Sequence, residues 1–280
     1  MKIQPCAKIN LGLNIVNKRQ DGYHDLETVF YPVRIHDEIE ITETATPHGC
    51  SQEMPTGCSL EIEGHEIEGD MEKNLVVKAY RLLASDHPLP PVHIRLDKQI
   101  PMQAGMGGGS ADCAYTIRLL NDMFGIGISV SEMERYAARL GADCAFFITA
   151  KPSYAEGIGD VLTPIELDLS NYFIAIVKPS LSISTKEAFA GIRVKRPQMC
   201  CKDIVRLPVD QWKPLLKNDF EESIIPQYPV IADLKNALYD EGALYAAMSG
   251  SGSALFGIFS QRPEMENPLF TDCYTNIIKG

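Results

Sequence analysis

A glycine-rich stretch carries the clearest chemical signal in the chain. Four glycines fall within positions 105–109, and Ser110 follows at once. Alternating apolar residues at 92–96 predict a strand before this stretch, and a helical pattern follows it. Glycines leave backbone N–H groups uncovered, and the positive end of the helix dipole points to the same place. The segment therefore predicts a strand, a glycine loop and a helix that together bind phosphate.

Two common phosphate loops do not fit this stretch. A Walker loop needs a lysine next to its serine or threonine, but Ala111 follows Ser110 and no lysine stands there. A dinucleotide fingerprint starting at Gly105 would need its third glycine at position 110, which is a serine. The alternative is a flexible glycine turn that binds no phosphate. The helix that follows directly, together with Lys8 and Asp143 elsewhere, favours the phosphate site.

The first predicted strand carries a second candidate group. Apolar residues at the odd positions 9–15 alternate with Lys8, Asn10, Gly12 and Asn14. Residues two apart on a strand point to the same face, so Lys8 and Asn10 should be neighbours in space. The alternative is a lysine that simply faces solvent at a sheet edge.

Two further segments allow two interpretations each. Asp143 precedes the apolar run 144–148, and it is either a helix cap or a functional acid on a buried floor. It follows a predicted helix that begins with a capping box of Ser131 and Glu134. The loop 249–253 is rich in glycine and serine and lies between predicted strands at 243–248 and 254–259. It is either a hairpin connection or one wall of a ligand site.

Composition narrows the class of protein. The chain has 280 residues, of which 45% are hydrophobic and 22% charged, as in ordinary globular proteins. A net charge of −11 argues against a nucleic-acid partner. The start has no apolar signal region and no run is long enough to span a membrane, so we expect a cytoplasmic protein whose eight cysteines are free thiols. No His or Cys spacing predicts a zinc site, and we expect no protein-bound metal.

Three motifs together resemble the GHMP kinases, the family of galactokinase and of the homoserine, mevalonate and phosphomevalonate kinases. They are PMQAGMGGGS in the glycine loop, AKINLGLNIV with DGYHDLETVF near the start, and AAMSGSGSALFGIF near the end. The DGYH segment resembles the members that phosphorylate a cytidine diphosphate-linked polyol, at the 2-hydroxyl of its methylerythritol unit, in the non-mevalonate isoprenoid pathway. The resemblance extends over nearly the whole chain. Gln103 and Ala111 depart from it, because a small residue and a hydroxyl residue are usual there.

The resemblance implies an α/β fold of two domains with mixed or antiparallel sheets and a ligand cleft between them. We expect an ATP-binding domain at 1–155 and a ferredoxin-like domain at 156–280. The pattern also predicts helices at 74–84, 185–190 and 230–241, and strands at 26–33, 38–42, 60–63, 92–97 and 172–177. The protein should be a monomer or a weak homodimer.

The resemblance further implies an ATP-dependent kinase that uses ATP with Mg²⁺ and a small polyol substrate. Lys8 and Asp143 match the catalytic positions. The acceptor positions are Asn10, Tyr23, His24, Thr185 and Phe189, and Tyr23 and Phe189 fall in different predicted domains and could stack on a base. The nucleotide positions are Asn74, Lys98, Pro101, Met102, Gln103, Ala104, Gly105, Met106, Gly107, Gly108, Gly109, Ser110 and Ala111. The alternatives are another GHMP kinase of a phosphorylated or polyol metabolite, and a catalytically silent nucleotide-binding module of the same fold.

Overall fold

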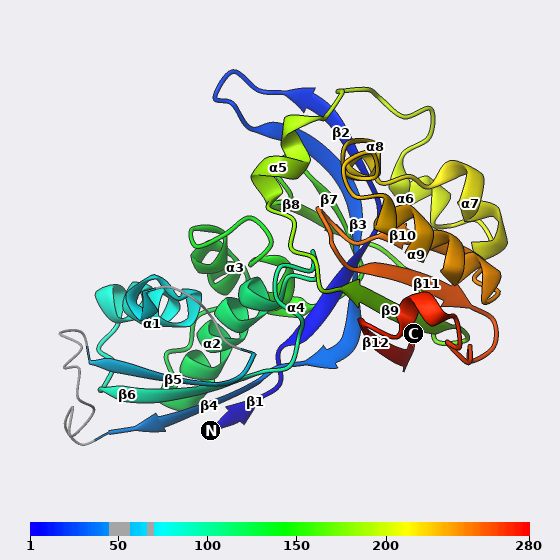
Figure 1. The fold of residues 1–280 in the computed structure, drawn as a ribbon. Coiled ribbons are helices and arrows are strands. Elements are labelled where there is room, and N and C mark those ends of the chain that lie inside the picture. The colour runs from blue at the N-terminus through cyan, green and yellow to red at the C-terminus, as the bar shows by residue number, and fades with distance from the viewer. Residues whose placement is uncertain (45–56, 66–69) are drawn as a thin grey trace. The chain divides into compact units, whose positions relative to one another are not determined.

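The computed structural model describes residues 1–44, 57–65 and 70–280 (Figure 1). The chain forms two compact units that are not consecutive in sequence. The first unit comprises 1–7, 35–102 and 107–150, and the second comprises 8–34, 103–106 and 151–280. This division differs from the expected one at residue 155. Most of the long strands β2 (Cys6–Lys18) and β3 (His24–His36) lies in the second unit, because they form one sheet with strands from beyond residue 150.

A mixed four-stranded sheet forms the base of the first unit. Its order is β1-β4-β6-β5, and only the β5–β6 pair is parallel. Alternate residues of β4 and β6 are buried, which is the period that the sequence predicts for half-buried strands. The bounds are β1 (Lys2–Ile3), β4 (Glu38–Glu43), β5 (Cys58–Gly64) and β6 (Val92–Lys98).

Helices cover one face of this sheet. Figure 1 shows α1, α2 and α3 side by side on that face. Helix α2 follows the glycine loop directly, as expected, and its apolar side is buried against α1, α3 and α4. The bounds are η1 (Met71–Lys73), α1 (Leu75–Asp86), α2 (Gly108–Phe124), α3 (Val130–Ala138) and α4 (Phe146–Thr149).

The start of α3 corrects one prediction. The capping box is made by Ser129 and Glu132, not by Ser131 and Glu134. Both pairs have the same spacing, but Ser129 has the extended backbone that a cap requires, and its side chain and that of Glu132 bond each other's backbone N–H. The helix therefore begins two residues earlier than the prediction.

Two sheets form the frame of the second unit, with the orders β2-β3-β7-β8 and β10-β11-β9-β12. The second of these is antiparallel throughout. Strands β7 and β8 form a hairpin where the sequence suggested a domain boundary, because Gly157 and Gly159 serve its turn. The bounds are β7 (Ser153–Glu156), β8 (Val161–Pro164), β9 (Phe173–Pro179), β10 (Tyr245–Met248), β11 (Leu255–Phe259) and β12 (Cys273–Lys279).

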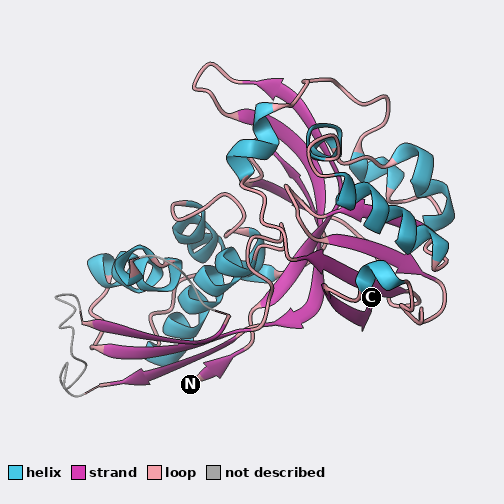
Figure 2. Ribbon diagram, viewed as in Figure 1, coloured by secondary structure: helices cyan, strands magenta, loops and turns pink. Residues whose placement is uncertain are grey.

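The helices of the second unit complete its core. Figure 2 shows α9 lying along a face of the β10-β11-β9-β12 sheet, and Ile231, Leu234 and Leu238 of α9 belong to the same buried cluster as Ala246 and Leu255. The predicted helix at 185–190 is confirmed as α5. The bounds are α5 (Thr185–Ala190), α6 (Cys201–Ile204), η2 (Val209–Gln211), α7 (Trp212–Leu215), α8 (Asp219–Ile224), α9 (Pro229–Asp240) and η3 (Pro268–Phe270).

Candidate active site

Lys8 is a buried lysine in the middle of a strand. Its exposed fraction is 3%, so the solvent-facing edge lysine is ruled out. The ammonium donates a hydrogen bond of 2.5 Å to Oδ1 of Asn10 and lies 5.0 Å from the centre of the Phe30 ring. The predicted neighbourhood of Lys8 and Asn10 is therefore confirmed. Burying an ammonium group costs free energy unless neighbouring groups compensate for the lost water, and Asn10 and Phe30 contribute to this compensation.

The same strand is joined to the glycine loop. The backbone N–H of Lys8 donates to the carbonyl of Met106 over 2.9 Å. The loop 249–253 meets the glycine loop as well, since Oγ of Ser249 donates to the carbonyl of Gly105 over 2.9 Å. Three stretches that lie far apart in the sequence thus come together within the second unit, and the loop 249–253 both connects β10 to β11 and contacts the glycine loop.

Gly105 lies against the backbone of Ser249 in the loop 249–253. Its φ is +70°, and a Cβ atom there would lie 1.9 Å from the backbone oxygen of Ser249. Two residues earlier, Gln103 has φ of +48°, in the left-handed region that glycine adopts most easily. The departure at Gln103 thus places a long side chain at a position whose backbone favours glycine.

The glycine loop ends at a helix with an open N-terminus. Gly107 is the N-cap of α2, has φ of +73° and provides no side chain to cap the helix. The first N–H groups of this 17-residue helix therefore have no capping side chain, as a phosphate site requires. A Cβ atom at Gly108 would lie 3.1 Å from Cγ2 of Ile100 and 3.3 Å from Nζ of Lys98, whereas Gly109 has ordinary room.

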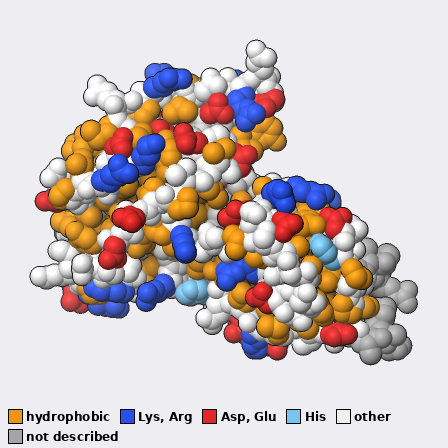
Figure 3. Space-filling view, turned by 180° about the vertical axis from the view of Figure 1, so that it is seen from behind, with side chains coloured by type: hydrophobic (Ala, Val, Ile, Leu, Met, Phe, Trp, Pro, Cys, Tyr) orange, Lys and Arg blue, Asp and Glu red, His pale blue; other side chains and the backbone are white. Residues whose placement is uncertain are grey.

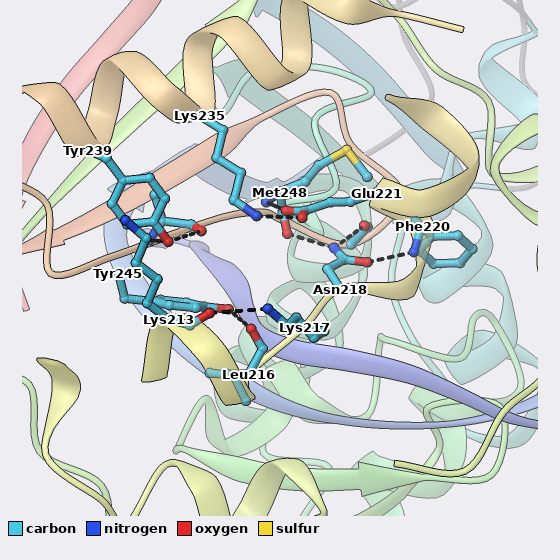
Figure 4. Close-up of polar contacts among 12 residues, drawn as sticks. Lys213, Leu216, Lys217, Asn218, Phe220, Glu221, Lys235, Tyr239, Tyr245 and Met248 are labelled. Atoms are coloured by element: carbon cyan, nitrogen blue, oxygen red, sulfur yellow. Dashed lines mark hydrogen bonds and ion pairs between the residues drawn. The ribbon is translucent and has the colours of Figure 1, made fainter. Parts of the chain in front are cut away.

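Side chains of the N-cap and first turn of α8 bond the backbone of Met248 and of the loop 249–253 (Figure 4). Nδ2 of Asn218 donates to the carbonyls of Met248 and Gly250 over 2.7 and 2.9 Å. Glu221 accepts the N–H of Met248 over 2.8 Å and pairs with Lys235 over 2.6 Å. Sequence reasoning missed these residues. The available signal was Asn218 as the N-cap of an acidic first helical turn.

Lys98, predicted near the nucleotide, lies in a buried ion cluster in the first unit. It is 1% exposed and pairs with Asp37 and, over 2.7 Å, with Asp112. The other oxygen of Asp37 accepts the N–H groups of Gln99 and Ile100. Burial alone would lower the pKa of Lys98, but attraction to the two carboxylates outweighs it and raises that pKa. The lysine therefore stays charged beneath the start of α2.

Asp112 is an acid of this cluster with a raised pKa. Burial raises its pKa to about 8, because attraction to Lys98 only partly offsets the loss of water and Asp37 adds repulsion. The two carboxylates also differ in their hydrogen-bond partners. Asp37 accepts donors at both oxygens, while Oδ1 of Asp112 has no partner among the described residues. Asp112 therefore holds the proton of the cluster.

This shift predicts a pH-dependent stability. The unfolded chain releases the Asp112 proton near its ordinary pKa of 3.8, while the folded chain keeps it to about 8. The stabilisation is complete below that range and is lost as the pH rises through it, by at most about 1.4 kcal/mol per pH unit. Asp112→Asn should therefore flatten the free energy of unfolding measured in urea between pH 5 and 8. An equal slope in both proteins would contradict the buried proton.

Two other predicted residues also lie in the first unit. Asn74 is the N-cap of α1, and its side-chain oxygen accepts the N–H of Val76 over 3.0 Å. Asp143 is half-buried in the turn that precedes α4. The N-cap of α4 is Ala145, so the interpretation of Asp143 as the cap of that helix is wrong.

All five predicted acceptor residues belong to the second unit. The rings of His24 and Phe189 stack with centroids 4.9 Å apart and an interplanar angle of 20°. Oγ1 of Thr185 lies 3.4 Å from Oγ of Ser251. Tyr23 is 61% exposed and belongs to the same unit as Phe189, which corrects the expectation of different domains. In this structure Phe189 stacks on His24, and the ring of Tyr23 is left open to solvent.

The described part of the chain lacks two kinds of feature. Among its residues, no three His, Cys, Asp or Glu side chains group as a metal site. None of its helices has both the length and the apolarity to cross a bilayer. Figure 3 shows acidic, basic and apolar side chains interspersed over the visible face.

Comparisons with known proteins agree with this geometry. Residues 74–151 match the GHMP kinases N terminal domain, and residues 203–268 match the GHMP kinases C terminal domain. The phosphate loop, the fold and these matches define an ATP-dependent small-molecule kinase. A solved structure of 4-(cytidine 5′-diphospho)-2C-methyl-D-erythritol kinase is similar over 100% of both chains, with a TM-score of 0.78 and 26% identity. The fold also matches homoserine kinase from Cytophaga hutchinsonii, with a TM-score of 0.67, 16% identity and 98% and 94% of the two chains covered.

Curated relatives narrow the family. A 4-diphosphocytidyl-2-C-methyl-D-erythritol kinase from Bacteroides fragilis is 52% identical over 91% of each chain. The enzyme of the same name from Bacteroides thetaiotaomicron is 50% identical over 98% of this chain and 96% of its own. The one from Porphyromonas gingivalis is 44% identical, with coverage of 98% and 97%. The chain therefore belongs to the 4-diphosphocytidyl-2-C-methyl-D-erythritol kinase family of the GHMP kinases.

Proposed function

We propose that the protein transfers the γ-phosphoryl group of ATP to the 2-hydroxyl of 4-diphosphocytidyl-2-C-methyl-D-erythritol. The names of its relatives support this acceptor. The observation that carries the proposal is the bond between the Lys8 backbone and Met106, because it fixes a buried lysine beside a phosphate loop. We further propose that the enzyme works in the cytoplasm as a monomer or a weak homodimer.

Phosphoryl transfer mainly requires that the protein position the two reactants and supply positive charge around the transferred phosphoryl group. The N–H groups of the glycine loop and the start of α2 would hold the phosphates, with Asn74 and Lys98 supporting the nucleotide side. Mg²⁺ would come with ATP and neutralise phosphate charge. Lys8 would polarise the hydroxyl or stabilise the charge in transit. Asp143 would accept or orient the proton of the hydroxyl.

Five side chains would bind the acceptor. Asn10 and Thr185 offer hydrogen bonds, and Tyr23, His24 and Phe189 offer rings for the cytosine. The cytosine would require the stacked rings of His24 and Phe189 to rearrange or would stack on their open side together with Tyr23.

An ADP-release assay with several acceptors tests the proposal. We expect turnover with 4-diphosphocytidyl-2-C-methyl-D-erythritol and little with homoserine or mevalonate. Preference for another polyol or phosphorylated acceptor would contradict the proposed substrate and leave a GHMP kinase of different specificity. Binding of ATP without transfer to any acceptor would indicate a silent nucleotide-binding module. A large decrease of ADP release in Lys8→Ala, with a residual rate that can still be measured, would show that the measured turnover belongs to this site.

Tyr23→Ala tests the cytidine site with little risk to the fold, because this side chain is 61% exposed. Stacking on a base is worth roughly 1–3 kcal/mol. Acceptor KM should therefore rise about tenfold to a hundredfold, while KM for ATP stays unchanged. CMP should compete with the acceptor in the unmodified enzyme and more weakly in the variant. Equal inhibition of both proteins by CMP would contradict a role of Tyr23 in stacking.

A further inference from the structure

The hydrogen bond between Lys8 and Asn10 continues into a longer chain of hydrogen bonds. Nδ2 of Asn10 donates to Oγ1 of Thr28 over 3.0 Å, and Oγ1 of Thr28 donates to the carbonyl of Gly12 over 2.5 Å. Thr28 is on β3, which is the neighbour of β2, and its exposed fraction is 0%. Nothing in the motifs singles this threonine out.

The carbonyl of Gly12, at one end of this chain of hydrogen bonds, fixes which atoms donate and which accept. A carbonyl can only accept, so the hydroxyl proton of Thr28 goes to Gly12, and the lone pairs of Thr28 are left to accept from Asn10. The amide of Asn10 must then turn its NH₂ group to Thr28 and its oxygen to Lys8. A flipped amide would place its NH₂ group against the Lys8 ammonium, donor to donor. The Gly12 carbonyl and the Lys8 ammonium therefore require the same orientation of the Asn10 amide, and the hydroxyl of Thr28 holds its NH₂ group in that orientation.

We propose that Thr28 is a positioning residue for phosphoryl transfer, which holds the Lys8 ammonium in place through the oriented amide of Asn10. The inference rests on the proposed function, in which Lys8 acts on the acceptor hydroxyl. The ring of Phe30, two residues along β3 and on the same face, lies under the ammonium and supports the same position. A displacement of about 1 Å in such a group can cost a hundredfold in rate.

Thr28→Val and Thr28→Ser form a matched pair for the test. Valine keeps the shape of threonine but removes the hydroxyl, while serine keeps the hydroxyl. We expect valine to lower kcat by about tenfold to a hundredfold with KM for ATP unchanged, and serine to stay within about threefold of the unmodified enzyme. If Thr28→Val does not fold, Thr28→Cys, which has a weak donor of similar size, is measured in its place with the same expectation.

A Lys8→Ala background separates positioning from a general packing effect. If Thr28 acts through Lys8, Thr28→Val should lower kcat no further in that background. An equal loss in both backgrounds, an unchanged kcat in Thr28→Val, or a serine variant as slow as the valine variant would each overturn the proposal.

A spectroscopic readout keeps the test independent of the acceptor. The side-chain amide signal of Asn10 in a ¹⁵N NMR spectrum, assigned by its loss in Asn10→Ala, should exchange slowly with water in the unmodified protein. It should exchange quickly in Thr28→Val. If the unmodified protein does not turn over the proposed acceptor, the proposed function fails, and this signal still decides whether Thr28 orders Asn10. An unchanged rate of exchange of the Asn10 amide with water in Thr28→Val would overturn the proposal that Thr28 orients Asn10.

Discussion

Asp143→Asn should lower kcat by about a hundredfold to ten-thousandfold, the range that general acid–base groups contribute. The substitution keeps the size of the side chain but removes the negative charge and the strongest acceptor for the proton of the hydroxyl. KM for ATP should change little, because the glycine loop and the start of α2 are untouched. Single-turnover measurement of ADP formation with saturating acceptor would report the chemical step directly.

Asp122→Asn is the matched control for this experiment. Asp122 is an exposed aspartate in the last turn of α2. The Asp122→Asn substitution makes the same change of charge in the same unit, and we expect it to leave kcat and thermal stability unchanged. A kcat for Asp143→Asn within a fewfold of the control would remove Asp143 from the catalytic residues.

Gly105→Ala should destabilise the protein by about 2–6 kcal/mol. An alanine at φ of +70° costs about 1–3 kcal/mol, and forcing its Cβ against the Ser249 carbonyl costs a similar amount. The variant should also bind ATP more weakly, because the glycine loop must move away from the loop 249–253. Urea unfolding and KM for ATP measure the two effects.

Gly109→Ala provides the comparison within the same loop. A Cβ atom there would come no closer than 4.0 Å to Leu75, and the residue is helical. Alanine in a helix is favoured over glycine by about 1 kcal/mol, so this variant should be as stable as the unmodified protein or more stable. If Gly105→Ala were as stable as Gly109→Ala, the contact between the two loops would not be a tight one.

The sequence predicted those parts of the fold that depend on neighbours in the chain. Period-2 alternation placed Lys8 beside Asn10, and the glycine loop was expected between a strand and a helix. The sequence did not predict the correct helix cap where two local sequence patterns are equivalent. Ser129 and Ser131 both precede a glutamate at the spacing of a capping box, and only the backbone conformation selects Ser129.

Residues that act over long separations could not be predicted in this way. Asn218 supports Met248 from 30 positions away, and Thr28 orders Asn10 from 18 positions away. Each of these side chains has an ordinary local explanation, as a helix cap or as a β-branched residue in a strand. Only the tertiary structure shows that Asn218 contacts the loop 249–253 and that Thr28 contacts Asn10.

The interleaved sequence of the two units has a consequence for synthesis on the ribosome. The second unit contains most of β2, near the start of the chain, and it is completed by β12 (Cys273–Lys279), which pairs with β9. At roughly 5–20 residues per second, β12 is made tens of seconds or less after the strand that bears Lys8. During that interval the nascent chain exposes the unpaired edge of β9. We therefore expect a newly made chain to need shielding from its neighbours until β12 has been made and has paired with β9.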